Sequence, residues 1–419
     1  MAHGKSHAIT ERQTALPASL AALSPKALLL GLVLVGAGFG AATAGGGGLE
    51  HFLFSYLTAY TFALSIALGG LIFLLLQHVT AAAWSVAVRR MAENVVGTLP
   101  WLALLFVPLV VLIAIGKGSL VWMWLDPAWV AENKLALPAK AVVYDAYLNR
   151  PFFLVRIAIY FAIWIGLARF FVGNSVAQDK DGDPGRSLRM RKLSAPSILL
   201  FALSLTFFGF DVLMSLDPQW FSTIFGVYLF AGCMLAFLTF VTLLTMLVQR
   251  RGGLEGLVTD EHYHDLGKLT FAFVFFWGYI AFSQYMLIWY ANIPEETIWF
   301  KHRQEGDWAV FSFVLLFGHL LLPFGGLLSR WVKRSRPALA FWAVWLLGMH
   351  FVDLFWIVMP TYAQKVGDGH HVHLGATDLL VWLGFVALLV GLTLRTAKGR
   401  PILALRDPRL PEALAFHNI

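Results

Sequence analysis

Long apolar runs recur along the whole of this 419-residue chain. Each approaches the roughly 20 residues that an α-helix needs to cross the hydrocarbon core of a bilayer. Lipid offers the backbone no hydrogen-bond partner, so only helices and closed barrels span a membrane, and barrel strands alternate polar with apolar residues. These runs do not alternate, and only 13% of the residues are charged. The sequence therefore predicts an all-α integral membrane protein.

Ten membrane-spanning helices are expected, with both ends of the chain on the same side. We place them at residues 27–44, 53–77, 95–115, 151–172, 195–214, 223–248, 268–290, 308–328, 338–358 and 376–394. Residues 1–26 then form a leader, 27–394 one transmembrane domain and 395–419 a tail. Ala42-Thr43-Ala44 resembles a signal-peptide cleavage site, but the polar leader is long for a signal peptide, so we expect the first span to be retained.

Lys and Arg are concentrated in alternate loops. Arg89-Arg90 and the loops around residues 186–192 and 330–336 lie on one side of the predicted membrane, whereas the loops of the other side hold few basic residues. The positive-inside rule places the basic loops, and with them both termini, in the cytoplasm. Because the basic residues follow the topology in this way, the net charge of +7 does not indicate a nucleic-acid partner.

The chain has few residues that could hold a metal or a redox centre. Cys233 is the single cysteine, which excludes an internal disulfide, an iron–sulfur cluster and an attached c-type haem. His370, His371 and His373 form a short cluster in an outer loop without a cysteine partner, and we predict no metal site there. We expect this chain to bind no cofactor of its own, although a quinol remains a candidate ligand.

Ionisable side chains inside spans are costly and are functional candidates by default. Asp211 lies near the outer end of the fifth span, with Ser204 two turns earlier on the same face. It is a candidate proton acceptor, or a structural carboxylate bonded to a neighbouring helix. Gln284 and Tyr285 lie in the outer third of the seventh span, so Asp211, Gln284 and Tyr285 are candidates for lining a quinol site.

Three further candidates lie in the eighth and ninth spans. His350 and Asp353 are three residues apart and share a helix face, so they could form a two-member proton relay or a buried pair that fixes packing. His319 stands four residues before Pro323, which disrupts the helix bond to the carbonyl of residue 319. Asp211, His319, His350 and Asp353 are therefore the candidates for a proton path.

Other features indicate structural roles. The segments Met123–Trp129 and Met214–Trp220 share the pattern M-x-L-D-P-x-W just outside two helices, which suggests that one turn is used twice. Ser55, Thr58, Ser65 and Gly69 form a stripe on the second span that is typical of close helix packing. Asp378, at the start of the tenth span, is expected to be a helix N-cap.

Several segments together resemble a known family. They are Gln77-His78 with Trp84 and Arg89-Arg90; Phe210–Pro218; His262–Leu269 running into Phe282–Thr297; Ser329-Arg330 with Lys333-Arg334; and Asp353 with Trp356 and Met359-Pro360. The stretch 262–297 is the most specific of them. In these segments, which run from about residue 50 to about residue 395, the chain resembles the F subunit (ActF) of bacterial alternative complex III. That subunit belongs to the NrfD/PsrC-like superfamily of quinol-interacting membrane anchors.

This resemblance implies a fold of two four-helix bundles plus two further helices. It implies a subunit of a quinol:cytochrome c oxidoreductase in the bacterial inner membrane, working with a homologous quinol-site subunit, a multihaem cytochrome c and an iron–sulfur subunit. The complex passes electrons to cytochrome c or to a terminal oxidase, and this subunit is a structural partner that could carry a proton path. Two alternatives remain: an anchor with its own quinol site, and a secondary transporter.

Overall fold

The computed structural model describes residues 9–136 and 143–418. Within these residues the chain is helical and contains no strand. Ten helical stretches are long and apolar enough to cross a membrane, and each contains or overlaps one of the predicted spans. The first stretch starts well before residue 27, because α2 begins at Ala18. The prediction of a multi-pass all-α membrane protein is confirmed.

The helices have the following bounds. They are α1 Glu11–Thr14, α2 Ala18–Ala44, α3 Gly48–Val79, α4 Val86–Val96, α5 Leu99–Ala114, α6 Pro127–Ala136, α7 Arg150–Asp181, α8 Pro184–Phe208, α9 Phe225–Arg250, α10 Asp260–Ala291, α11 Pro294–His302, α12 Trp308–Val314, α13 Leu322–Leu328, α14 Arg330–Arg334, α15 Arg336–Lys365, α16 Ala376–Ala397 and α17 Leu410–Leu414. Three π-helical segments, Val143–Tyr147, Gly209–Leu213 and Leu315–Leu321, interrupt or adjoin them.

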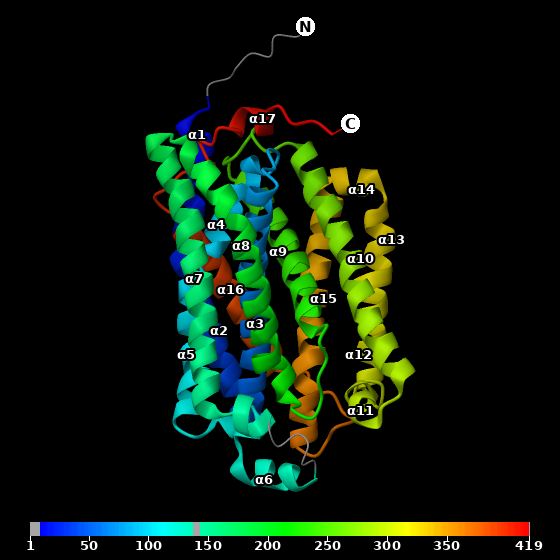
Figure 1. The fold of residues 1–419 in the computed structure, drawn as a ribbon. Coiled ribbons are helices and arrows are strands. Elements are labelled where there is room, and N and C mark those ends of the chain that lie inside the picture. The colour runs from blue at the N-terminus through cyan, green and yellow to red at the C-terminus, as the bar shows by residue number, and fades with distance from the viewer. Residues whose placement is uncertain (1–8, 137–142, 419) are drawn as a thin grey trace.

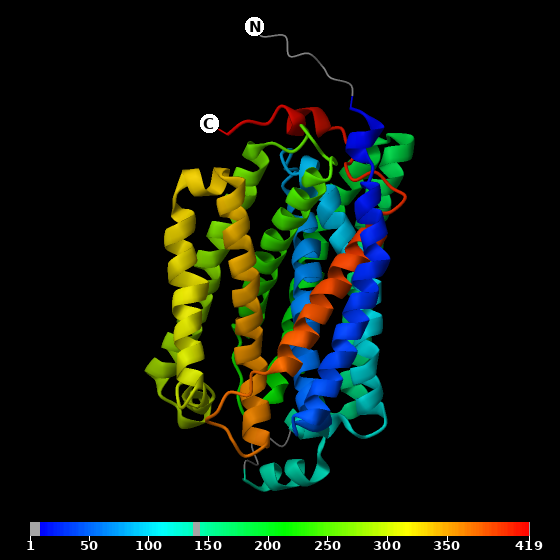
Figure 2. The same cartoon turned by 180° about the vertical axis from the view of Figure 1, so that it is seen from behind.

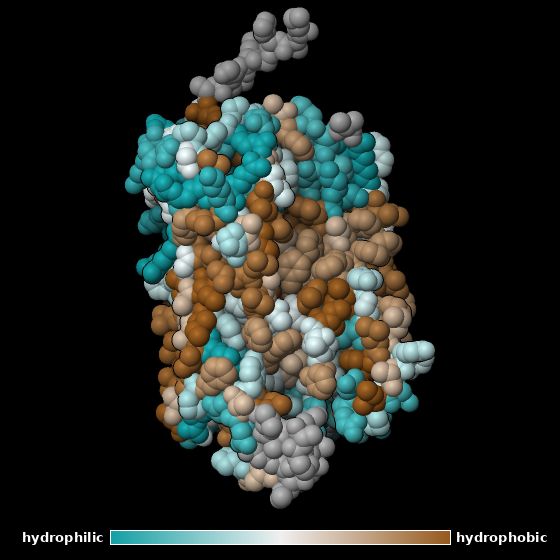
Figure 3. All heavy atoms as spheres, in the orientation of Figure 1, coloured by the Kyte–Doolittle hydropathy of each residue, from teal (hydrophilic) through white to brown (hydrophobic). Residues whose placement is uncertain are grey.

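The long helices stand side by side, and the first and last helices, α1 and α17, lie at one end of the bundle, hereafter the inner end (Figures 1 and 2). The short helix α6 lies beyond the opposite, outer end. On the face shown in Figure 3, hydrophobic residues form a broad band between the hydrophilic ends. Such a band is the surface that a bilayer requires.

Helix α3 occupies the centre of the bundle. It contacts α2, α4, α5, α7, α8, α9, α15 and α16, and 94% of its most apolar window is buried. It packs tightly against α9 at Gly69, where any Cβ atom would collide with the carbonyl oxygen of Cys233. Gly69 is therefore a packing residue, as the sequence predicts.

Helices α2 and α16 cross closely on the outside of α3, as Figure 2 shows. Glycines make this crossing possible, because small residues let two helix backbones approach in lipid. A Cβ atom on Gly384 would lie 2.8 Å from the Val35 side chain and 3.0 Å from the Gly31 carbonyl oxygen. Gly36, on the same helix as Gly31, has nothing within 4 Å of such an atom.

The repeated M-x-L-D-P-x-W segments do form the same first turn. Met123–Leu125 and Met214–Leu216 are both 3₁₀-helices. The two turns also pack together, because Trp124 Nε1 donates to Ser215 Oγ at 3.2 Å and Trp122 Nε1 donates to the Val212 carbonyl at 3.1 Å. After the shared turn the two segments differ, because helix α6 follows Met123–Leu125, whereas among the described residues no such short helix follows Met214–Leu216.

We predict that Gly384→Val destabilises the protein by about 1–3 kcal/mol, because the added side chain overpacks the α2–α16 crossing. Gly36→Val is the matched control and should leave stability unchanged. Cys233 is the single cysteine and is buried, so its reaction with a maleimide during thermal unfolding in detergent reports the midpoint. Equal midpoints for the two variants would show that the crossing tolerates extra volume.

Candidate functional site

Asp211 lies in the π-helical segment Gly209–Leu213, which continues α8 at the outer end. Its carboxylate accepts two hydrogen bonds from the Arg156 guanidinium, at 2.7 and 2.9 Å, and a third from the Tyr160 hydroxyl at 2.7 Å. All three side chains are buried. Bidentate Arg–carboxylate pairs are the strong form of an ion pair. The charge of Asp211 is therefore compensated within the bundle.

The contact between α7 and α8 continues from this ion pair toward the inner end. One α7 face carries Arg156, Tyr160 and Trp164 at four-residue spacing. Trp164 Nε1 donates to Ser204 Oγ at 2.9 Å. Asp211 and Ser204 do share a face, as the sequence suggests, and both bond to α7. These contacts fit the alternative in which Asp211 is a structural carboxylate bonded to a neighbouring helix.

The other two candidates for a quinol site contact different groups. Gln284, on α10, accepts a hydrogen bond from Ser222 Oγ at 3.1 Å. Tyr285 packs edge-on against Phe300 of α11. Among the described residues, no contact joins Asp211 to Gln284 or Tyr285. The contacts therefore do not bring the three candidate quinol-site residues together.

Asp353, on α15, lies in a different environment from Asp211. Its carboxylate accepts hydrogen bonds from the Tyr228 hydroxyl of α9 and from Trp277 Nε1 of α10, the latter at 3.2 Å. The side chain is 2% exposed. Both donors are neutral, and Asp353 takes part in no ion pair in the described part of the chain. A buried charge without a partner is expensive, so this carboxyl group can hold a proton.

Two buried histidines lie near Asp353. His350 Nε2 shares a hydrogen bond of 2.8 Å with Ser65 Oγ of α3, and the His319 ring lies 4.0 Å from the Trp277 ring between centroids. Neither ring nitrogen of His319 has a hydrogen-bond partner among the described residues, and the same holds for His350 Nδ1. His350 and Asp353 do not bond to each other, so a direct two-member relay is not formed. Trp277 instead links Asp353 to His319.

The helix around His319 is irregular, as Pro323 predicts. Leu315–Leu321 is π-helical, and the backbone N–H of Leu322 donates to the Phe317 carbonyl instead of to the Gly318 carbonyl. Trp345 Nε1 of α15 donates to the freed Gly318 carbonyl at 2.7 Å. π-Bulges inside helices occur frequently at functional sites. Asp211 and His319 are thus two ionisable candidates that both stand in π-helical segments.

Arg303 is a residue that the sequence reasoning missed. It is 1% exposed in the loop after α11, and burial lowers its pKa to about 9, which leaves it charged at neutral pH. Its guanidinium donates to the Trp356 and Ile357 carbonyls at 3.0 and 2.8 Å. Pro360 lacks the N–H that would bond to the Trp356 carbonyl, so Arg303 satisfies it. Arg303 thus bonds to α15 about one turn from Asp353, on the side toward the outer end.

Asp378 is not the N-cap of α16, because that position is Gly375 and Asp378 lies three residues further on. Its carboxylate accepts from the Gly375 N–H at 2.9 Å and from Ser55 Oγ of α3 at 2.6 Å, and it pairs with His51 at 3.2 Å. Asp378 therefore fixes α16 to α3 at the outer end. Ser55 and Ser65, predicted as packing residues, both bond to ionisable side chains.

Two of the missed residues had a signal in the sequence. Arg156 and Tyr160 are one turn apart in the span that precedes Asp211, so an antiparallel neighbour could bring them to that carboxylate. Tyr228, near the outer end of α9, and Trp277, in the middle of α10, had no such signal, because a single aromatic residue in an apolar span is typical of packing or of an interfacial belt. Only packing shows that their polar atoms point at Asp353.

Comparison with known proteins gives no match, either to a family model or to a curated protein. The functional argument therefore depends on the residues and contacts described above.

We expect Asp211→Asn and Asp353→Asn to differ in their effect on stability. The first leaves the buried Arg156 without a counter-charge, which costs about 3–5 kcal/mol, and the second leaves no charge unpaired and costs about 1–2 kcal/mol. Cys233 reactivity during unfolding measures both. The double variant Asp211→Asn/Arg156→Gln should recover part of the loss, and equal losses in the two single variants would contradict the distinction.

Proposed function

We propose that this chain is a membrane subunit of a quinol-oxidising electron-transfer complex of the alternative complex III type, as its resemblance to the F subunit implies. In this proposal it lies in the bacterial inner membrane with both termini in the cytoplasm. Electron carriers belong to partner subunits, because one cysteine and no haem-attachment motif leave this chain without the usual ligands. It works beside a homologous quinol-site subunit, and it conducts protons.

The packing of the helices supports the first part of this proposal. Helix α3 packs with α4, α5, α7 and α8, and α5 and α8 both pack against α7. Helices α9, α10, α12, α13 and α15 pack among themselves, while α2 and α16 pair outside both groups. This pattern is compatible with two four-helix bundles plus two further helices, since α4 and α5 form one span and α12 and α13 form another.

The observation that supports the proposed proton path is the burial of Asp353 among neutral hydrogen-bond donors. A subunit that is only a scaffold has no need for a fully buried carboxylate whose partners are Tyr228 and Trp277. Asp211 shows how the same protein compensates a charge that serves structure, through Arg156. The difference between the two carboxylates is the difference between a fixed ion pair and a group that can gain and lose a proton.

Buried hydroxyl groups extend the polar region around Asp353. His350 bonds to Ser65 on α3. On α9, Gly232 lies against the His350 ring, and Thr239, Thr242 and Thr245 follow toward the inner end, all buried. Each threonine hydroxyl bonds to a backbone carbonyl of its own helix. We propose that protons move between the inner end and Asp353 along this face of α9, with His350 and His319 as further carriers.

A quinol site of its own is the second candidate function. A cavity of about 220 Å³ at the outer end is lined by Tyr144, Tyr147, Met214 and Ser215, among others. Ser215 Oγ donates to the backbone carbonyl of Asp211, which places the cavity beside the Asp211 ion pair. Its aromatic and apolar lining is of the kind that holds a quinol ring. Loss of quinol oxidation in Ser215→Ala, with the complex intact, would favour this alternative.

Assembly is tested by purifying the tagged chain in mild detergent. We expect multihaem cytochrome c and iron–sulfur subunits to accompany it, seen by mass spectrometry and by a reduced-minus-oxidised spectrum. A chain that purifies alone and colourless would overturn the assignment to a complex. Substrate uptake by that isolated chain in liposomes would then favour a secondary transporter.

The proton path is tested in the complex with Asp353→Asn. We predict that the variant assembles but loses proton translocation, with proton-coupled turnover lowered by roughly tenfold or more. Asp378→Asn is the control, because it removes a buried carboxylate at the outer end that α3 and α16 hold in place. An unchanged proton-to-electron ratio in Asp353→Asn would assign Asp353 a structural role.

A further inference from the structure

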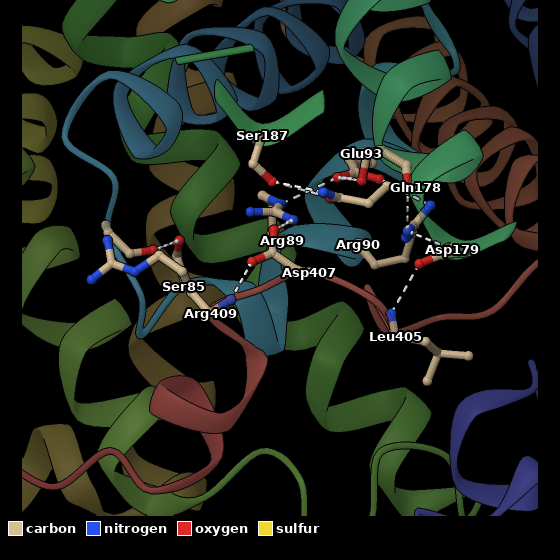
Figure 4. Close-up of polar contacts among 12 residues, drawn as sticks. Ser85, Arg89, Arg90, Glu93, Gln178, Asp179, Ser187, Leu405, Asp407 and Arg409 are labelled. Atoms are coloured by element: carbon tan, nitrogen blue, oxygen red, sulfur yellow. Dashed lines mark hydrogen bonds and ion pairs between the residues drawn. The ribbon is translucent and has the colours of Figure 1, made fainter. Parts of the chain in front are cut away.

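The inner end contains a cluster of charges around α4 that is shown in Figure 4. Arg89 pairs with Glu93 at 3.3 Å and with Asp407 of the C-terminal tail at 2.6 Å. Arg90 pairs with Glu93 at 3.2 Å and with Asp179 of α7 at 2.6 Å. All of these side chains are at least 90% buried. The cluster fixes the tail to the bundle.

A cavity of about 290 Å³ opens beside this cluster, between the end of α3, the start of α8 and the tail. His78 lines it and is 6% exposed, yet its Nε2 atom has no hydrogen-bond partner among the described residues. The Oε1 atom of the adjacent Gln77 is likewise without a partner. Buried polar atoms are nearly always bonded, so unsatisfied atoms in two residues that line the same cavity point to a missing polar partner.

The lining of this cavity is positively charged. Arg89, Arg191 and Arg409 contribute to it, and Asp407 is the one carboxylate among the described residues that line it. Burial raises the pKa of Asp407, but its ion pair and hydrogen bond with Arg89, together with the Arg409 backbone N–H, leave that pKa lowered on balance, so Asp407 neutralises Arg89. Arg409 pairs with Glu412 at the surface, where such pairs are weak. Arg191 has no ion-pair partner in the described chain.

The position of the cavity favours a lipid over a soluble anion. Its walls include the apolar side chains of Val86 and Leu188, and Leu188 is 52% exposed at the surface of the bundle. Ser187 and Pro184, in the first turn of α8, bring the positive end of that helix to the same cavity. A ligand there could place acyl chains along α8 and an anionic group among the arginines.

We propose that this cavity binds the phosphate-bearing headgroup of an anionic phospholipid, with Arg191 and Arg409 contacting the phosphate and His78 Nε2 donating a hydrogen bond to the headgroup. Basic pockets between helices on the cytoplasmic side are suited to such lipids. The site is separate from Asp353 and does not depend on the proposed electron-transfer function. The bound lipid would join α3, α8 and the C-terminal tail at the inner end.

The purified, delipidated protein is titrated with phosphatidylglycerol, with phosphatidylcholine and with inorganic phosphate, and binding is measured by native mass spectrometry and by the thermal midpoint. We expect phosphatidylglycerol to bind and to raise the midpoint, and phosphatidylcholine to do neither. The double variant Arg191→Gln/Arg409→Gln should weaken phosphatidylglycerol binding by roughly tenfold or more, because each arginine contributes separately. His78→Gln should weaken it less.

Arg189→Gln is the matched control, because Arg189 is an exposed arginine on the same helix that does not line the cavity. Its affinity for phosphatidylglycerol should equal that of the unchanged protein. An equal loss in the control would show that general surface charge attracts the lipid. Unaltered binding in the double variant would place the lipid elsewhere, and inorganic phosphate that binds as tightly as phosphatidylglycerol would make this a soluble-anion site.

Discussion

Close packing around α3 is the constraint on which the rest of the structure depends. This helix has neighbours on all sides, and its crossing with α9 requires glycine at position 69 because the Cys233 carbonyl occupies the space of a side chain. A helix enclosed in this way cannot turn its polar residues toward water. Ser55 and Ser65 therefore bond to partners within the bundle, Asp378 at the outer end and His350 in the middle. His78, at the inner end, lines the arginine-lined cavity, and its Nε2 atom has no partner among the described residues.

Charge compensation separates the structural groups from the candidates for function. Asp211 has Arg156, Glu93 has two arginines, and Asp407 has Arg89. Arg303 donates to the Trp356 carbonyl that Pro360 leaves free and to the Ile357 carbonyl. Asp353 differs from all of these, because its contacts come from neutral donors. In a low-dielectric interior this difference decides whether a carboxylate is held ionised or can exchange a proton.

The sequence predicted the all-α class and the ten spans, because hydropathy acts over whole spans and does not depend on which helices touch. It also predicted an irregular helix near His319 from Pro323, although the carbonyl that Trp345 reaches is that of Gly318 and not that of residue 319. It could not pair Asp211 with Arg156, or Asp353 with Tyr228, because these contacts depend on the relative rotation of separate helices. Asp378 shows the same limit: its place near a helix start suggested a cap, whereas its contact with Ser55 depends on how α16 crosses α3.

The most direct measurement of the central claim is the infrared difference spectrum between the oxidised and reduced complex, in the region of the carboxylic C=O stretch. If Asp353 exchanges a proton during turnover, the spectrum contains a carboxyl band that is lost in Asp353→Asn and retained in the control Asp378→Asn. A spectrum without such a band, or a band that persists in Asp353→Asn, would contradict the assignment of Asp353 to a proton path.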